Sequence, residues 1–193
     1  PYPFYLAYAI EKNNVEELGD PKDWQAEWKW DGIRGQLIKR NGELFVWSRG
    51  EELMTEKFPE YQSLRNLLPD GIAMDGESSP RGEQKPVPWA LLQTRIGRKN
   101  VTKKQLQEAP IAFFAYDLLE YNGEDWRNKT LDERRIKLEE IVASVNHPPL
   151  LISPIVSFDS WEQLAELRKG SREMGAEGFM LKRKNSTYQV GRK

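Results

Sequence analysis

An Asn-Gly pair at positions 41 and 42 is the feature that most restricts what this chain can fold into. The segments on either side, 35–40 and 43–48, are predicted to be strands. Asn-Gly favours a two-residue type I′ turn, because both central residues of that turn need positive φ. We therefore predict an antiparallel hairpin over 35–48, a connection that an all-parallel sheet does not contain.

The remaining segments predict helices mixed with strands. Three helices should begin at a hydroxyl residue that is followed three positions later by Gln or Glu, which is the capping-box pattern. These starts are Thr102 with Gln105, Thr130 with Glu133, and Ser160 with Gln163. A further helix is predicted over 59–68, with Tyr61, Leu64, Leu67 and Leu68 on one stripe.

Core and strand patterns complete the expected architecture. After Thr130 the apolar residues Leu138, Ile141, Val142 and Val145 recur at helical spacing and should face a core. Strands are predicted over 24–28, 72–74, 111–119, 150–156 and 178–183. Strands mixed with helices, together with one hairpin, favour an α+β fold with largely antiparallel sheets.

Composition limits the classes of protein that this chain can represent. Its 193 residues suit one domain, and 29 Lys and Arg against 30 Asp and Glu give a net charge of only −1. The absence of cysteine excludes a disulfide framework and a thiol nucleophile, and the single His147, beside two prolines, argues against histidine-dependent mechanisms. No apolar run approaches the ~20 residues of a membrane span, so we expect a soluble, cytoplasmic protein without a membrane partner.

One lysine stands in a setting suited to covalent chemistry. The spacing Lys29-x-Asp31-Gly32-x-Arg34 places an amine, a tight turn and a cation close together after a predicted strand. An unperturbed lysine has a pKa of about 10.4, so a free amine at neutral pH costs roughly 4.6 kcal/mol. Nearby cations would oppose a second positive charge and so favour the free amine.

Four further patterns follow Lys29 in a fixed order. They are Ser48-Arg49-Gly50, Asp75-Gly76-Glu77, Phe114-Ala115-Tyr116-Asp117 and Glu177-Gly178-Phe179-Met180-Leu181-Lys182. With the run at Lys29 they resemble motifs I, Ia, III, IIIa and IV of the covalent nucleotidyltransferases, the superfamily of ATP-dependent DNA ligases, RNA ligases and mRNA capping enzymes. The resemblance covers nearly the whole chain. It implies an ATP-grasp-like nucleotidyltransferase domain with two largely antiparallel sheets flanked by helices.

The resemblance also implies a role for each motif residue. Lys29 would be the catalytic nucleophile that attacks the α-phosphate of ATP and carries AMP as a phosphoramidate. Arg34, Lys182 and a bound Mg²⁺ would lie beside its amine and oppose its protonation. Nucleotide-binding roles fall to Glu27 and the backbone of Trp28 at the adenine edge, Arg34 and Arg49 at the ribose and phosphates, Glu77 at a ribose hydroxyl, Tyr116 and Phe179 on the two faces of adenine, and Lys182. Glu177 and Glu77 would bind Mg²⁺, with Mn²⁺ as an alternative.

Some of these residues have structural alternatives. Phe179 on a strand also suits core packing, and Arg49 could be a solvated loop charge. On a strand the side chains of Trp28 and Trp30 share the face opposite Lys29, where core filling is expected. Asp31 is expected to fix the turn that orients the lysine.

A local basic tract lies between 81 and 104, with seven Lys or Arg against one acidic residue. Such a tract suits contact with the DNA phosphate backbone, and a solvated helical face is its alternative. The candidate DNA-binding residues are Arg95, Arg98, Lys99, Lys103 and Lys104.

Two segments, 92–99 and 188–193, are similar to bacterial ATP-dependent DNA ligases. Only 28 residues precede Lys29, which disfavours an NAD-dependent ligase. The Lys-x-Lys of motif V and the oligonucleotide-binding-fold domain of related ligases are not within the 193 residues. We therefore expect residues 1–193 to be the adenylation domain of a larger, monomeric ligase that seals nicked double-stranded DNA in repair, replication or recombination and acts with that domain in cis. The alternatives are an RNA ligase, a GTP-dependent capping-type enzyme, and a non-catalytic nucleotide- or nucleic-acid-binding module.

Overall fold

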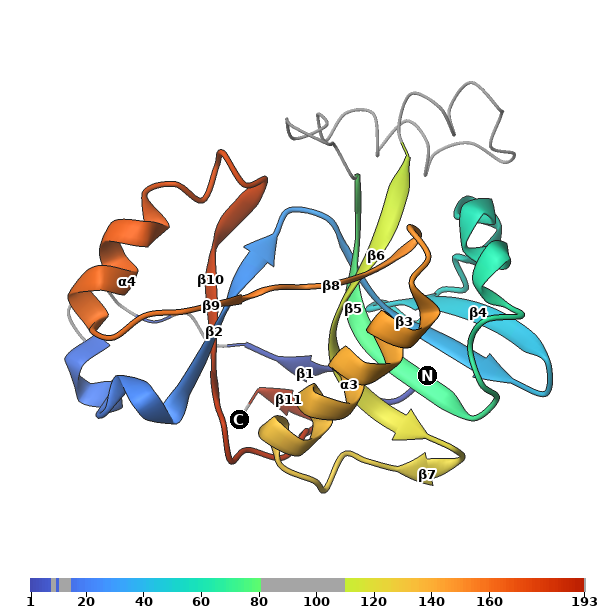
Figure 1. Ribbon diagram of the computed structural model, residues 1–193, viewed down its shortest axis with the longest axis horizontal. Helices are drawn as coiled ribbons and strands as arrows, with labels where there is room; N and C mark the ends of the chain where they lie inside the picture. The colour runs from blue at the N-terminus through green and yellow to red at the C-terminus, as the bar shows by residue number, and fades with distance from the viewer. Residues whose placement is uncertain (8–9, 11–14, 81–109, 193) are drawn as a thin grey trace.

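The computed structural model describes residues 1–7, 10, 15–80 and 110–192, and its strands form two main sheets (Figure 1). The six-stranded sheet has the order β4-β3-β5-β6-β7, with β8 paired to β6, and the three-stranded sheet has the order β10-β2-β9. Every described pairing in these two sheets is antiparallel except that of β6 with β8. The strands are β2 Trp24–Trp30, β3 Ile33–Arg40, β4 Glu43–Ser48, β5 Ile72–Pro80, β6 Ile111–Tyr121, β7 Glu124–Asp125, β8 Leu150–Ile152, β9 Ile155–Val156 and β10 Ala176–Arg183. The predicted α+β class with largely antiparallel sheets is confirmed.

The predicted hairpin joins β3 to β4. Asn41 and Gly42 have φ values of 52° and 76°, so both central turn residues are left-handed, as the Asn-Gly pair predicts. Arg40 is the register partner of Glu43, which fixes the alternation of both strands. Strand β3 therefore enters the six-stranded sheet directly after the Lys29 motif.

Two of the predicted capped helices are confirmed. Helix α3, Leu131–Val145, begins after Thr130, whose Oγ1 accepts a hydrogen bond from the Glu133 amide at 3.3 Å. Helix α4, Trp161–Arg168, begins after Ser160, whose Oγ accepts from the Gln163 amide at 3.1 Å. Figure 1 shows α3 across β6 and β8, and α4 beside the three-stranded sheet. The start predicted at Thr102 lies outside the described residues.

The helix predicted over 59–68 is instead a 3₁₀ helix, η4, Pro59–Leu64. It has no side-chain cap at its N-terminus, and its turns are closed by short-range bonds such as that from the Tyr61 amide to the Phe58 carbonyl. Leu67 is 48% exposed, so the expected apolar stripe is incomplete. The other 3₁₀ helices are η1 Val15–Leu18, η2 Pro21–Asp23 and η3 Thr55–Lys57.

Other differences concern strand length. The strand predicted over 72–74 extends to Pro80 as β5. The one predicted over 150–156 is divided into β8 and β9 at Ser153 and Pro154, because proline has no amide hydrogen for a sheet.

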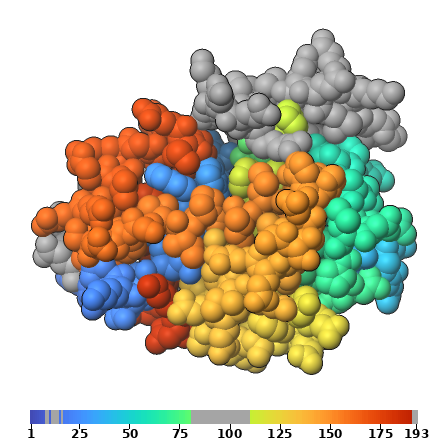
Figure 2. Space-filling model, in the orientation of Figure 1, coloured from blue at the N-terminus to red at the C-terminus, as the bar shows by residue number. Residues whose placement is uncertain are grey.

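The main core lies between the six-stranded sheet, α3 and η4. Leu37, Met74 and Phe113 from the sheet are fully buried there with Leu138 of α3 and Tyr61 of η4. In Figure 2 the chain from α3 to β9 covers the middle of the visible face. None of the described helices is both long and apolar enough to cross a membrane.

A second, smaller cluster brings the two terminal segments together. Tyr188 packs there with Ile38, Ala73 and Leu119, and Tyr5 packs against the cluster. Next to it, β1 (Tyr5–Leu6) pairs in parallel with β11 (Gly191–Arg192). Residues that are far apart in the sequence therefore meet beside the six-stranded sheet.

Candidate active site

Strands β2 and β10 place the Lys29 motif beside the Glu177 motif. In their antiparallel register Lys29 is opposite Gly178, and Glu27 is opposite Met180. Alternate residues of a strand lie on one face, and cross-strand partners share a face. We call the face that carries these groups the lysine face; its members are Gln25, Glu27, Lys29, Gly178, Met180 and Lys182.

Two ion pairs of different burial belong to this region. Lys29 Nζ lies 3.4 Å from Glu177 Oε2, and both side chains are more than half exposed, at 55% and 52%. Lys182 Nζ lies 3.0 Å from Glu27 Oε1, and the Glu27 side chain is buried. Gln25 Nε2 donates to the other oxygen of Glu27 at 2.7 Å. Lys29 is thus the accessible amine, and Glu27 is a fixed acceptor.

Lys29 and the two cations expected near it each pair with a carboxylate. The ion pair of Lys29 is with the carboxylate of Glu177, whereas Arg34 is paired with Asp75, and Lys182 with Glu27. The sequence could not reveal these partners, because each lies on a strand distant along the chain. In this structure each of the two expected cations is paired with a carboxylate other than that of Glu177.

The turn after Lys29 requires glycine. A Cβ added to Gly32 would lie 2.5 Å from the Ser78 carbonyl oxygen of β5 and 3.0 Å from the Glu77 Cγ. The Asp31 amide donates to the Gly175 carbonyl at 3.3 Å, which ties the same turn to the segment before β10. This bond uses the backbone of Asp31, and a turn-fixing role for its side chain stays a prediction.

Two carboxyl groups near this turn lack enough nearby positive charge to offset their burial and the charge of neighbouring carboxylates. Burial, and then the charge of Asp75, raise the pKa of Glu77 to about 8, although Arg34 and a hydrogen bond from the Gly32 amide act in the opposite direction. Burial, and then the Glu177 carboxylate, raise the pKa of Asp31. Groups of this kind favour a bound cation.

The described part of the chain contains no group of three or more His, Cys, Asp or Glu arranged to hold a metal ion. Magnesium commonly uses one or two carboxylates and completes its shell with water and substrate phosphates. The carboxyl groups of Glu77 and Glu177 fit that pattern, because they interact electrostatically and one of them is exposed.

Tyr116 connects the lysine face to the six-stranded sheet. Lys182 Nζ lies 4.5 Å from the centroid of its ring. Tyr116 belongs to β6 and Lys182 to β10, so the ammonium covers the ring face that is directed toward the three-stranded sheet. Burial, and then Asp75, raise the pKa of the Tyr116 hydroxyl well above its usual value.

The register corrects the expectation for Phe179. Its ring stacks on Trp28 with centroids 4.4 Å apart, on the face opposite Lys29. Met180, which is opposite Glu27, takes the position on the lysine face instead. Sequence reasoning missed Met180, although counting alternate residues back from Lys182 would have found it. Trp30 packs on Phe114 with centroids 5.1 Å apart, in accord with a structural role.

The two arginines of the motifs lie near each other but differ in environment. Arg34 binds Asp75 through Nε at 3.3 Å and Nη2 at 2.8 Å, and its side chain is 20% exposed. Arg49 is exposed, and its amide donates to the Arg34 carbonyl at 3.2 Å. The five candidate DNA-binding residues, Arg95, Arg98, Lys99, Lys103 and Lys104, lie outside the described residues.

A family model described as an ATP dependent DNA ligase domain matches residues 6–193. The chain belongs to this family. This chain is 29% identical over 197 residues to a DNA ligase of Nanoarchaeum equitans. The alignment covers 99% of the chain and 35% of the relative. The chain is 34% identical over 171 residues to a DNA ligase of Aeropyrum pernix, which covers 86% of the chain and 28% of the relative. The ligase domain thus spans about a third of the length of these curated relatives.

Solved structures agree with this assignment. The ligase domain from M. tuberculosis LigD superposes with a TM-score of 0.75 at 26% identity, covering 99% of this chain and 57% of that one. A Chlorella virus DNA ligase-adenylate gives a TM-score of 0.69 at 21% identity, covering 99% and 64%. The second likeness concerns the fold alone.

Proposed function

We propose that this domain transfers AMP from ATP to Lys29. The Nζ atom attacks the α-phosphorus, a P–N bond forms, the bond from that phosphorus to the bridging oxygen breaks, and pyrophosphate leaves while the amine loses a proton. The observation that carries the proposal is the accessible amine of Lys29 on one face with Glu27, Met180 and Lys182. An exposed nucleophile flanked by fixed groups suits a reaction in which the substrate must be positioned.

The same face suggests how the base binds. Adenine would lie between the Tyr116 ring and the Met180 side chain, with Met180 replacing Phe179 in this role. The Glu27 carboxylate could then accept a hydrogen bond from the exocyclic amine. The Lys182 ammonium lies over the Tyr116 ring, so a base stacking on that face would displace it and make it available to the phosphates.

The carboxylates supply the metal-binding part of the proposal. Glu177 and Glu77 would hold Mg²⁺, or Mn²⁺, together with the triphosphate. The ion, when bound, neutralises negative charge on the phosphates. A cation at Glu177 would also compete with the Lys29 ion pair, which is exposed and weakly held.

The later steps belong to the larger protein that we propose. AMP would pass from Lys29 to the 5′-phosphate of a nick in double-stranded DNA, and the 3′-hydroxyl would then displace AMP and join the strand. Support comes from the family and from the DNA ligase names of the relatives. In this proposal residues 1–193 are a monomeric adenylation domain, an oligonucleotide-binding-fold domain acts in cis, and the ligase serves repair, replication or recombination in the cytoplasm.

The direct test incubates the chain with ATP labelled in the α-phosphate, with and without Mg²⁺. We expect label on the protein that survives alkali and is released by acid, as a P–N bond requires. The label should be absent in Lys29→Ala and retained in Lys22→Ala, which removes an exposed lysine of η2. Unlabelled ATP should compete and GTP should not. Label on the Lys29→Ala protein would refute the nucleophile, and competition by GTP would favour a capping-type enzyme.

A further inference from the structure

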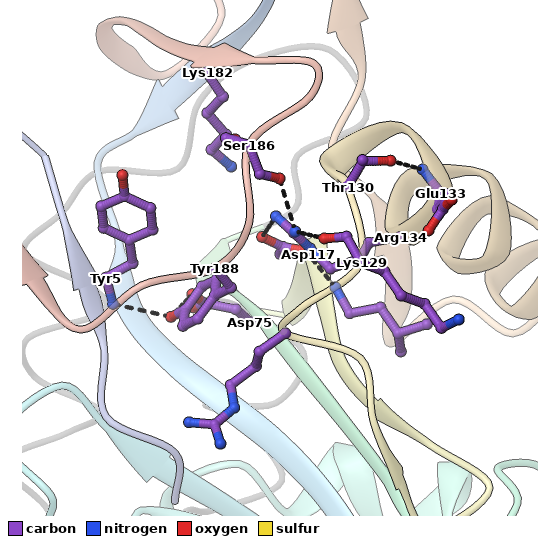
Figure 3. A network of polar contacts seen from close by, with 12 residues as sticks. Tyr5, Asp75, Asp117, Lys129, Thr130, Glu133, Arg134, Lys182, Ser186 and Tyr188 are labelled. Atoms are coloured by element: carbon purple, nitrogen blue, oxygen red, sulfur yellow. Dashed lines mark hydrogen bonds and ion pairs between the residues drawn. The ribbon is translucent and has the colours of Figure 1, made fainter. Parts of the chain in front are cut away.

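Tyr188 lies outside the five motifs, yet its hydroxyl meets two of them. The hydroxyl donates to Asp75 Oδ2 at 2.7 Å, and Figure 3 shows these two side chains together. It accepts from Arg34 Nη2 at 3.3 Å. It also accepts from the Tyr5 amide at 3.1 Å. A phenol can donate one hydrogen bond and accept two, so the capacity of this hydroxyl is fully used.

Asp75 depends on this hydroxyl. Its side chain is only 1% exposed, and its acceptor bonds come from Arg34 and Tyr188. A buried carboxylate needs such donors to offset its desolvation. Because the Asp75 oxygens hold the fork of Arg34, any group that fixes Asp75 also sets the direction of the guanidinium.

The segment that carries Tyr188 is itself held in place. The Tyr188 amide donates to the Arg127 carbonyl at 2.9 Å. Two residues earlier, the Ser186 carbonyl accepts from Arg134 Nη1 at 3.1 Å, and Arg134 also binds the buried carboxylate of Asp117 at 2.7 Å. The ring of Tyr188 is buried in the second cluster. The hydroxyl therefore has a fixed position relative to the site.

We infer that Tyr188 is a positioning residue for nucleotide binding, which through Asp75 orients the Arg34 guanidinium toward the ribose and phosphates of ATP. The inference rests on the proposed function, because it needs a nucleotide at Arg34. It adds a residue of the segment after β10 to a site built from β2, β3, β5, β6 and β10.

The same sheet offers a matched control. Arg40, at the other end of β3, binds Glu120 with Nη2 2.7 Å from Oε1, and the Tyr2 hydroxyl donates to that oxygen at 2.5 Å. This triad also combines an arginine of β3, a carboxylate of the sheet and a tyrosine of a terminal segment. Tyr2→Phe therefore removes the same chemical group from a triad that does not contact the lysine face.

The test measures AMP transfer to Lys29 against ATP concentration in Tyr188→Phe and Tyr2→Phe. Tyr188→Phe removes one charge-assisted hydrogen bond from a group that acts in ATP binding. The ATP concentration for the half-maximal rate should therefore rise about tenfold. The rate at saturating ATP should stay within about twofold of the parent. Tyr2→Phe should leave both values unchanged. A merely structural Tyr188 would lower the melting temperature and the active fraction without changing the ATP dependence, and that result would overturn the inference.

A double-variant cycle adds a second criterion. In an Arg34→Ala background the further change Tyr188→Phe should alter the ATP dependence less than about twofold, because its route of action is already removed. An undiminished tenfold effect in that background would contradict action through Arg34. Failure of the parent chain to take label at all would count against the proposed function; in that case nucleotide titration of the same variants tests the positioning of Arg34 separately.

Discussion

The exposed pair of Lys29 with Glu177 and the buried triad of Arg34, Asp75 and Tyr188 represent two ways of holding charge in one site. The first is 3.4 Å long and more than half exposed, while the second has a 2.8 Å contact and a carboxylate that is 1% exposed. Exposed pairs contribute about 0–1 kcal/mol, whereas breaking a buried pair costs about 3–5 kcal/mol. The amine that we propose as the nucleophile is thus free to change partners, whereas the groups that we propose to orient the substrate are held in place.

The largest effect on stability should come from Asp75→Asn. The amide removes the charge that compensates partly buried Arg34, so we expect the free energy of unfolding to fall by about 3 kcal/mol. Glu177→Gln breaks the exposed pair and should cost less than about 1 kcal/mol. Denaturant unfolding of both variants measures the difference. Equal losses would remove the distinction between the two pairs.

The pH dependence of the free energy of unfolding should reveal the burial of Glu77. The pKa of Glu77 is raised to about 8, so its carboxyl keeps its proton in the folded state after the unfolded chain has lost it. The contribution of the Glu77 carboxyl to the free energy of unfolding is therefore greatest below about pH 4.5 and is lost as the pH rises toward 8.

Glu77→Gln should remove this dependence. Between pH 5 and pH 8 the parent should lose on the order of 3 kcal/mol more unfolding free energy than the variant. Glu43→Gln, at an exposed position in β4, should keep the slope of the parent. Parallel curves for the parent and Glu77→Gln would show that this carboxyl does not titrate abnormally.

The smallest effect concerns Lys182, which pairs with Glu27 on the lysine face and lies over Tyr116 of the six-stranded sheet. Lys182→Gln removes the cation from the Tyr116 ring and retains a donor for Glu27. A cation over an aromatic ring contributes roughly 0.5–1 kcal/mol, so adenosine should bind about two- to fivefold more tightly. AMP transfer from ATP should fall, because a phosphate-binding charge is lost. Calorimetry measures adenosine binding, and the labelling assay measures AMP transfer. Weaker adenosine binding in Lys182→Gln would contradict the proposed displacement of Lys182 by the base.

Local structure around the site could be predicted, because it depends on residues that are close together in the sequence. The turn at Gly32 and the caps of α3 and α4 depend on neighbouring residues, and they are where the patterns placed them. The pairing of Tyr188 with Asp75 joins residues 113 positions apart, which local patterns do not encode. The placement of Met180 rather than Phe179 on the lysine face depends on strand register, because a shift of one residue moves a side chain to the other face.

The most direct measurement of the central claim is the position of AMP on the chain. After incubation with ATP and Mg²⁺, intact mass should show one added adenylate, and tandem mass spectrometry of peptides should place it on Lys29. Lys182, the other lysine of the lysine face, should carry none. An adenylate mapped to Lys182 or to any residue other than Lys29, or an unmodified chain under saturating ATP, would contradict the account.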